Sequence, residues 1–165
     1  NLSKNNSSAA IIGGGDGGVA RELSSKGFDL IDWYELDPEV VKVCQKHLLK
    51  VCGDIKANNK VKTYWGDAFE SIKKVKNSKY DKIFVDLNDD QFCIDLAAKN
   101  MKGLKRILKP GGIITAQVGC MSKKPRQVKN WLELLKNNFG NVTLDEIFIP
   151  SFDCKWNFAS SSNKN

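Results

Sequence analysis

Short apolar runs alternate with amphipathic stretches along the whole chain. Each run of about five apolar residues is followed by a segment in which apolar residues recur at the spacing of a helix. The pattern predicts strands at residues 9–13, 30–35, 62–65, 82–86, 112–118, 142–149 and 156–160. It predicts helices at residues 17–26, 38–50, 68–75, 91–108 and 126–138. Such alternation is typical of an α/β domain built on a mostly parallel sheet.

The order of these elements narrows the fold class. Five strand and helix units are followed by two consecutive strands, a layout that matches class I S-adenosylmethionine-dependent transferases, which are Rossmann-like, rather than dinucleotide dehydrogenases. We therefore expect a seven-stranded, mostly parallel sheet with helices on both faces and a ligand outside the carboxyl ends of the strands. The chain of 165 residues suffices for one domain, at 9–160, between polar tails at 1–8 and 161–165.

Composition excludes several classes of function. The formal charge of +7 comes with lysines spread over most of the chain, which favours a solvated basic surface and makes nucleic acid an unlikely partner. The five cysteines form no C-x-x-C pair, which argues against a metal site and a disulfide framework. The single histidine, His47, falls in a helical pattern and is expected near the surface. Without a signal peptide or an apolar span, we expect no membrane association and a cytoplasmic protein.

A glycine-rich turn follows the first predicted strand. Gly13 to Gly18 reads GGGDGG, which contains G-x-G-x-x-G with Asp16 in its middle. Glycines permit close approach of the backbone to a bound nucleotide. A carboxylate at this place repels a phosphate and attracts a cation, so the turn suits a sulfonium or an amine better than NAD. The alternative is that Asp16 only caps the following helix.

Acidic residues follow four successive predicted strands. They are Asp16, then Glu35 with Asp37, then Asp67, then Asp86 with Asp89 and Asp90. In a parallel sheet these positions open on one edge, which predicts a cleft for a cationic ligand rich in hydroxyls and amines. Asp37 and Asp67 could instead cap the helices that follow them. Asp81 precedes its strand and is expected to be a turn residue at the opposite edge.

Physical roles follow from these positions. At the end of the second strand, Glu35 can accept hydrogen bonds from ribose hydroxyls. Asp67 can accept a hydrogen bond from the amino group of adenine, while a neighbouring backbone N–H donates one to a ring nitrogen. Asp86 and Asp89 lie where a reacting amine would be held.

Taken together, these motifs resemble the spermidine and spermine synthase family of aminopropyltransferases. The matching residues are Gly13 to Gly18, E-L-D at 35–37, G-D-A at 66–68, V-D-L at 85–87, K-P-G-G at 109–112 and I-P-S-F at 149–152. They cover nearly the whole chain, from Ala10 to Ala159. The C-G-D at 52–54, with Cys44 before it, is similar to the spermine synthase branch, and Pro150 to Trp156 is similar to both spermine and thermospermine synthases.

The resemblance implies a reaction and a set of site residues. Such enzymes transfer the aminopropyl group of decarboxylated S-adenosylmethionine to a polyamine, from putrescine to spermidine or from spermidine to spermine or thermospermine, and release methylthioadenosine. It implies that the donor is bound by Gly13, Gly14, Gly15, Asp16, Glu35, Leu36, Asp67, Ala68 and Asp86. It assigns the polyamine to Asp16, Asp86, Asp89, Phe152 and Trp156, with Asp86 as the catalytic residue and no metal. Family members are usually homodimers.

The chain departs from the family pattern on the acceptor side. Phe152 stands where most relatives have a tyrosine, Cys154 stands where the spermine branch has an acid, and the loop after Asp86 lacks the usual proline. The resemblance also leads us to expect that the small N-terminal β domain of relatives is absent from this chain. We therefore expect donor binding with weak or no transfer by this chain alone. Two alternatives are an S-adenosylmethionine-dependent methyltransferase acting on a small molecule or RNA, and a non-catalytic binding module that keeps the fold.

Overall fold

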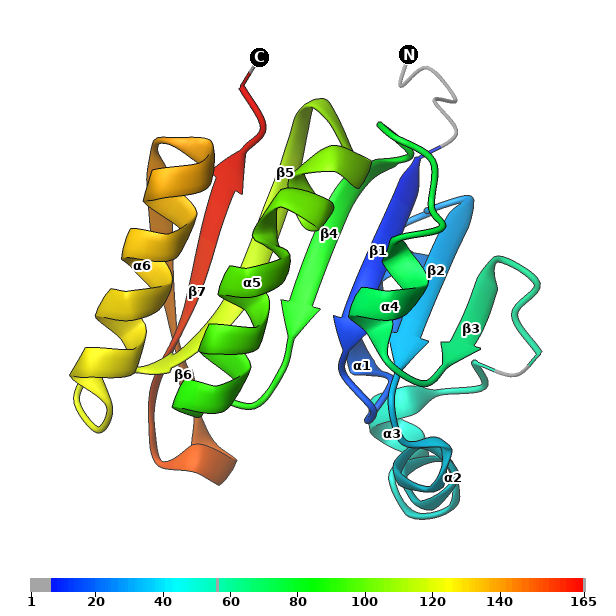
Figure 1. Ribbon diagram of the computed structural model, residues 1–165. Helices are drawn as coiled ribbons and strands as arrows, with labels where there is room; N and C mark the ends of the chain where they lie inside the picture. The colour runs from blue at the N-terminus through cyan, green and yellow to red at the C-terminus, as the bar shows by residue number, and fades with distance from the viewer. Residues whose placement is uncertain (1–6, 56, 165) are drawn as a thin grey trace, which may run out of the picture.

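Seven strands and six α-helices make up the part of the chain that the computed structural model describes, residues 7–55 and 57–164 (Figure 1). The strands are β1 (Ser8–Gly13), β2 (Leu30–Glu35), β3 (Val61–Trp65), β4 (Tyr80–Asp86), β5 (Leu108–Cys120), β6 (Val142–Ile149) and β7 (Cys154–Ser162). The helices are α1 (Gly18–Ser25), α2 (Pro38–His47), α3 (Leu49–Cys52), α4 (Ala68–Ile72), α5 (Gln91–Ile107) and α6 (Pro125–Phe139), with a 3-10 turn, η1 (Pro150–Phe152).

All strands join one sheet in the order β3-β2-β1-β4-β5-β7-β6. The pairs β3–β2, β2–β1, β1–β4 and β4–β5 are parallel, whereas β7 runs antiparallel to both β5 and β6. This arrangement confirms the predicted fold class. The register places Gly13 beside Asp86 and Glu35 beside Trp65, so the acids that end these strands share one edge of the sheet, at the bottom of Figure 1.

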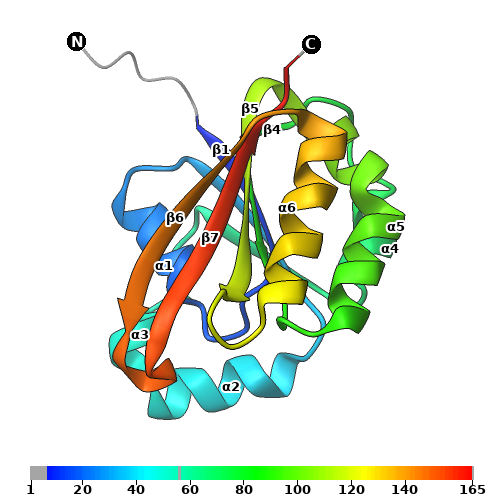
Figure 2. The same ribbon diagram turned by 90° about the vertical axis from the view of Figure 1, so that its left-hand side faces the viewer.

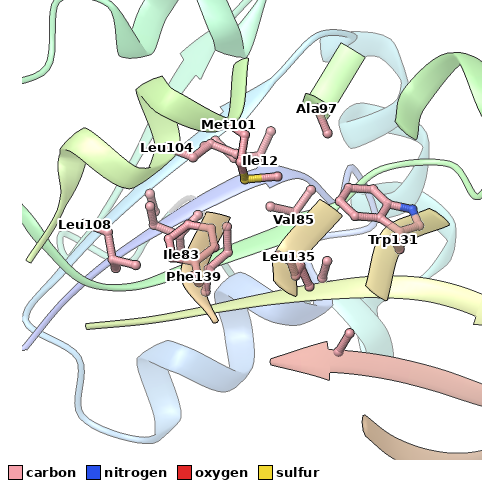
Figure 3. Packing of buried hydrophobic residues seen from close by; sticks show 14 of the residues in the cluster. Ile12, Ile83, Val85, Ala97, Met101, Leu104, Leu108, Trp131, Leu135 and Phe139 are labelled. Carbon is pink, nitrogen blue, oxygen red and sulfur yellow. The ribbon is translucent and has the colours of Figure 1, made fainter. Parts of the chain in front are cut away.

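Helices cover both faces of the sheet because successive side chains of each central strand point to opposite sides. In β1, Ala10 and Ile12 join the larger core beneath α4, α5 and α6, whereas Ala9 and Ile11 join the smaller core beneath α1 (Figure 2). Figure 3 shows Met101 and Leu104 of α5 packed over the sheet beside Ile12. The two cores pack helices against both faces of the sheet and so fix the positions of the carboxyl ends of its strands.

Several predicted boundaries differ from the structure, and two of the differences change an element that leads to the site. The helix expected at 38–50 breaks at Leu48, whose φ of −123° ends α2 before α3 begins. The strand expected at 112–118 starts earlier, because β5 begins at Leu108 and includes the K-P-G-G motif at 109–112. A register shift between Tyr80 and Lys82 absorbs the irregularity, and the backbone of Asn163 bonds to both Gly111 and Gly112.

The sheet extends past both predicted ends of the domain. Ser8 is buried in β1, and β7 continues to Ser162, with Ser161 donating to the carbonyl of Asn141 at 2.7 Å. Asn163 is also buried and donates to the carbonyl of Leu108 at 3.1 Å. The expected tails at 1–8 and 161–165 are thus shortened by polar residues that find partners inside the fold, and residues 1–6 of the first lie outside the described part.

Asp81 is not the turn residue that the sequence predicts. It lies within β4 and accepts hydrogen bonds from the backbone and hydroxyl of Ser8 at 2.9 and 2.7 Å. The ammonium of Lys109 is 2.9 Å from the same carboxylate, and the pKa of Asp81 is lowered, with these bonds outweighing its partial burial. At the edge opposite the glycine turn, Asp81 therefore ties β1, β4 and β5 together.

The remaining sequence features are surface or core groups. Within residues 7–55 and 57–164, no helix is both long and apolar enough to cross a membrane, and no group of three potential ligands is placed to hold a metal ion. His47 is exposed at the end of α2. The five cysteines are free thiols.

Candidate active site

A cavity of about 640 Å³ opens at the carboxyl edge of β1, β2 and β4. Its walls bring together every residue that the sequence assigned to the donor: Gly13, Gly14, Gly15, Asp16, Glu35, Leu36, Asp67, Ala68 and Asp86. Tyr34, Val40, Phe69, Leu87, Asn88, Phe92, Cys93, Leu96 and Gln117 complete its lining. The cavity is therefore assembled from the ends of several strands and the first turn of α5.

The glycine turn lies directly against the end of β4. The backbone N–H of Gly14 donates to the carbonyl of Asp86 at 2.9 Å. Gly13 has φ of +82°, and a Cβ added there would lie 2.4 Å from the same carbonyl oxygen. A Cβ added at Gly14 would lie 2.9 Å from the Asp86 carboxylate. Only glycine fits these two positions, because any side chain would push the turn away from Asp86.

Among the carboxylates that line the cavity, Asp86 is the one whose pKa is clearly shifted. It is half-buried, and burial followed by the negative charges of Asp16 and Glu35 raises the pKa of Asp86 from 3.8 to about 6. Among the described residues, no lysine or arginine lines the cavity. With Asp67, four carboxylates thus line one space without a lysine or arginine among its described lining residues, which is the environment that a cationic ligand would neutralise.

Asp16 contacts the start of α1 and also lines the cavity. Its carboxylate accepts a hydrogen bond from the N–H of Gly18 at 2.8 Å, where α1 begins. Gly17, in a left-handed conformation, is the capping residue of that helix, so Asp16 stands one position earlier. The Asp16 side chain is exposed and lines the cavity. Its bond to α1 fixes the carboxylate at the mouth of the cavity.

Glu35 and Asp37 have separate tasks. Glu35 is 8% exposed, and its carboxylate accepts from the N–H of Asp37 at 2.9 Å while facing the cavity. Asp37 accepts from the N–H of Glu39 at 2.8 Å and caps α2. Asp37 is not part of the cavity lining, so the capping alternative describes it.

Asp67 both caps a helix and lines the cavity. Its Oδ1 accepts from the N–H groups of Phe69 and Glu70 at 2.7 and 3.2 Å, which starts α4. Both of these bonds end on one oxygen, so Oδ2 is available to a hydrogen-bond donor in the cavity. Capping thereby orients the carboxylate for a ligand.

The residues predicted for the acceptor do not line this cavity, apart from Asp16 and Asp86. The Asp89 carboxylate forms an ion pair with Lys124 at 3.0 Å. Phe152 packs against Trp156 with ring centroids 4.6 Å apart. The indole N–H of Trp156 donates to the side-chain oxygen of Gln117 at 2.7 Å, and Gln117 lines the cavity. The residues predicted to bind the donor thus meet in one cavity, whereas most of those predicted to bind the acceptor lie outside its lining.

The sequence did not indicate that Gln117, or the apolar residues Phe92 and Leu96, would line the cavity. Gln117 lies near the end of β5 and its amide donates to the carbonyl of Leu87, so a search of strand ends for amides as well as acids would have found it. Phe92 and Leu96 of α5 have no such signal, since an exposed phenylalanine at a helix start is common in any protein. Phe92 is 73% exposed at the cavity wall.

Comparisons with known proteins agree with this geometry. The family model described as the spermine/spermidine synthase domain matches residues 1–165. A polyamine aminopropyltransferase of Prochlorococcus marinus (strain MIT 9215) is 34% identical over 169 residues, which cover 96% of this chain and 58% of that protein. Spermine synthase of Arabidopsis thaliana is 30% identical over 145 residues, covering 86% of this chain and 40% of that protein.

Two solved structures share the fold. A spermidine synthase in complex with the transition-state analogue AdoDATO superposes with a TM-score of 0.85 and 21% identity, covering 97% of this chain and 56% of that one. The spermidine synthase of Thermotoga maritima gives a TM-score of 0.84 at 21% identity, with 97% and 55% covered. The chain spans little more than half the length of these proteins.

Proposed function

The chain belongs to the spermine/spermidine synthase family, as its motifs predicted, and from this premise we propose that its cavity binds decarboxylated S-adenosylmethionine for aminopropyl transfer to an amine. One observation carries the proposal. Asp16, Glu35 and Asp86 face a single cavity whose described lining contains no lysine or arginine. A sulfonium with a propylammonium arm brings the positive charge that such a cavity lacks.

The cavity has groups for each part of the donor. The buried Glu35 carboxylate can accept hydrogen bonds from both ribose hydroxyls. The second oxygen of Asp67 can accept from the adenine amino group, with the ring between apolar side chains such as Leu36 and Phe69. Asp16, at the mouth, would hold the propylammonium. S-Adenosylmethionine carries an additional carboxylate, which these acids would repel.

Asp86 is placed to handle the proton of the acceptor amine. In the proposed displacement a bond forms between the amine nitrogen and the propyl carbon, and the bond from that carbon to sulfur breaks with its electron pair leaving on sulfur. An ammonium with a pKa of roughly 10.4 must first lose a proton. With its pKa raised to about 6, Asp86 is a stronger base than an ordinary aspartate, so it is suited to accept a proton from the attacking nitrogen.

The residues predicted to bind the acceptor amine support only weak transfer by this chain alone. Asp89 is paired with Lys124, and Phe152 supplies no hydroxyl where most relatives have a tyrosine. We propose that this chain binds the donor and transfers the aminopropyl group weakly by itself. Either putrescine or spermidine is the proposed acceptor for the intact protein, which we expect to be a cytoplasmic homodimer like its relatives.

Titration calorimetry with the two forms of the cofactor tests the proposed donor. We expect decarboxylated S-adenosylmethionine to bind at least about tenfold more tightly than S-adenosylmethionine, because the extra carboxylate meets the acids of the cavity. Replacing Asp16 with asparagine should remove most of that preference. The matched control is Asp37→Asn, which removes a nearby charge that caps α2 outside the cavity. Tighter binding of S-adenosylmethionine would instead favour methyl transfer.

A further inference from the structure

The indole of Trp33 contacts the glycine turn from the smaller core of the fold. Trp33 lies in β2, is 1% exposed and packs among the apolar residues beneath α1. It pairs with Ile11 of β1, and its Nε1 donates to the carbonyl of Gly13 at 2.7 Å, two residues further along β1. Gly13 lines the cavity, whereas Trp33 is not among the described lining residues. Trp33 therefore holds the turn without contacting the space proposed for the donor.

This hydrogen bond fixes one peptide group of the turn. The carbonyl of Gly13 and the N–H of Gly14 belong to the same peptide plane and point in opposite directions. The carbonyl accepts from Trp33, and the N–H donates to the carbonyl of Asp86 at 2.9 Å. Both polar groups of this peptide are thus held, one by a side chain of β2 and the other by the backbone of β4.

The glycine turn needs such a constraint because glycine permits many backbone conformations. Gly13 and Gly14 have φ of +82° and +69°, and neither has a Cβ to restrict rotation of the peptide between them. A rotated peptide would turn its carbonyl oxygen towards the carbonyl of Asp86 and would lose the contact between the turn and β4. Since Gly13, Gly14 and Asp86 all line the cavity, the orientation of this peptide determines the shape of that wall.

We propose that Trp33 is a positioning residue for the donor, because its indole N–H holds the peptide between Gly13 and Gly14 in the orientation that keeps the cavity ready for decarboxylated S-adenosylmethionine. This inference rests on the proposed aminopropyl transfer. Trp33 acts through Gly13 and touches neither the donor nor the reacting atoms. Without the N–H, the peptide rotates in a fraction of the molecules, and the apparent affinity for the donor falls with the fraction that keeps the binding orientation.

Trp33→Phe and Trp131→Phe form a matched pair of variants. Both tryptophans are 1% exposed, and both substitutions replace a buried indole with a phenyl ring. Trp131 lies in α6 and packs in the larger core, and its Nε1 finds no hydrogen-bond partner within residues 7–55 and 57–164 (Figure 3). Trp131→Phe therefore reports the cost of lost packing alone, whereas Trp33→Phe also removes a hydrogen bond from the glycine turn.

Titration calorimetry of the intact protein with decarboxylated S-adenosylmethionine measures the effect on the donor. We expect the Kd to rise about fivefold in Trp33→Phe, the change that corresponds to one ordinary hydrogen bond, and to stay within about twofold in Trp131→Phe. In steady-state kinetics at saturating donor, the KM for the acceptor amine should change less than about twofold in either variant. A rise in the donor Kd that is no larger in Trp33→Phe than in Trp131→Phe would overturn the proposal.

Benzothienylalanine in place of Trp33 tests the same hydrogen bond if Trp33→Phe does not fold. This amino acid keeps two fused rings and has sulfur where the indole has its N–H, so it removes the hydrogen-bond donor and retains the packing. The Kd for decarboxylated S-adenosylmethionine should again rise about fivefold. A Kd equal to that of the wild type would overturn the proposal.

Hydrogen exchange of the Gly14 N–H separates this inference from the proposed function, because it needs no ligand. In the free protein with isotope-labelled glycine, NMR should show this amide exchanging about fivefold faster in Trp33→Phe than in Trp131→Phe. The Gly140 N–H, which donates to the carbonyl of Lys136 at 2.9 Å, is the internal reference. Faster exchange in a protein that prefers S-adenosylmethionine would refute the proposed donor and support the positioning of the turn by Trp33. Unchanged exchange with normal aminopropyl transfer would refute the role of Trp33 alone.

Discussion

Replacing Asp86 with asparagine is expected to lower kcat for aminopropyl transfer in the intact protein by about 100-fold to 10,000-fold, the usual contribution of a general base. Asparagine has nearly the same shape and keeps the backbone contact with the glycine turn. It cannot accept a proton from the attacking amine. The donor should still bind, since Glu35 and Asp67 remain, and steady-state kinetics with calorimetry separates the two effects.

The same substitution is expected to stabilise the fold above neutral pH. The pKa of Asp86 is about 6 in the folded chain and 3.8 without the fold, so folding disfavours its ionised form. This penalty is absent at about pH 3, grows as the pH rises through the two pKa values, and is complete above about pH 7. Removing the charge should therefore raise the free energy of unfolding by about 3 kcal/mol at pH 8, with a gain that shrinks towards zero near pH 3.

Asp90→Asn is the control for this prediction. Asp90 caps α5 through the N–H of Cys93 at 2.8 Å and is not part of the cavity lining, and asparagine caps a helix equally well. Urea unfolding at pH 8 should show a gain for Asp86→Asn alone. A loss of stability at pH 8 in the Asp86 variant, or an unchanged kcat, would contradict the role given to this carboxylate.

Replacing Gly13 with alanine is expected to lower the free energy of unfolding by about 2 to 5 kcal/mol. An alanine in this left-handed conformation costs roughly 1–2 kcal/mol. Its Cβ would also lie 2.4 Å from the carbonyl oxygen of Asp86, and relieving such an overlap costs roughly 1–3 kcal/mol more. Because β1 and β4 pair at this point, the strain should also displace Asp86 and abolish donor binding.

Gly27→Ala separates the two contributions. Gly27 has φ of +83°, almost equal to the +82° of Gly13, but a Cβ added at Gly27 would meet no atom within 4 Å. We expect this variant to lose only about 1 kcal/mol and to bind the donor normally. Urea unfolding followed by circular dichroism measures both variants. Similar losses at the two positions would show that the close contact with Asp86 is not a constraint.

The fold, and the meeting of the predicted donor residues in one cavity, could be predicted from the sequence because both depend on simple periodic rules. Alternating strands and helices imply a parallel sheet, and a parallel sheet brings the residues after its strands to one edge, which is why Asp16, Glu35 and Asp86 meet. Leu48 and Leu108 show where these rules fail. The helical pattern continues through Leu48, where the helix breaks, and the polar and glycine-rich residues 109–112 hide the early start of β5 at Leu108.

The acceptor side could not be predicted because it depends on contacts between distant loops. The pairing of Asp89 with Lys124 requires that β5 pass beside the loop after β4, and no local spacing indicates this. Trp156 was predicted to touch the polyamine, yet the structure connects it to the cavity through Gln117. Long-range side-chain pairs of this kind follow from tertiary packing rather than from the pattern of each strand.

Mass spectrometry of the products made by the intact protein from decarboxylated S-adenosylmethionine tests the central claim most directly. With putrescine and spermidine offered together, we predict methylthioadenosine and an amine lengthened by one aminopropyl group in equal amounts, and both products formed at least about 100-fold more slowly by the Asp86→Asn variant. A methylated amine formed from S-adenosylmethionine, with no aminopropyl product from the decarboxylated form, would contradict the assignment of this cavity to aminopropyl transfer.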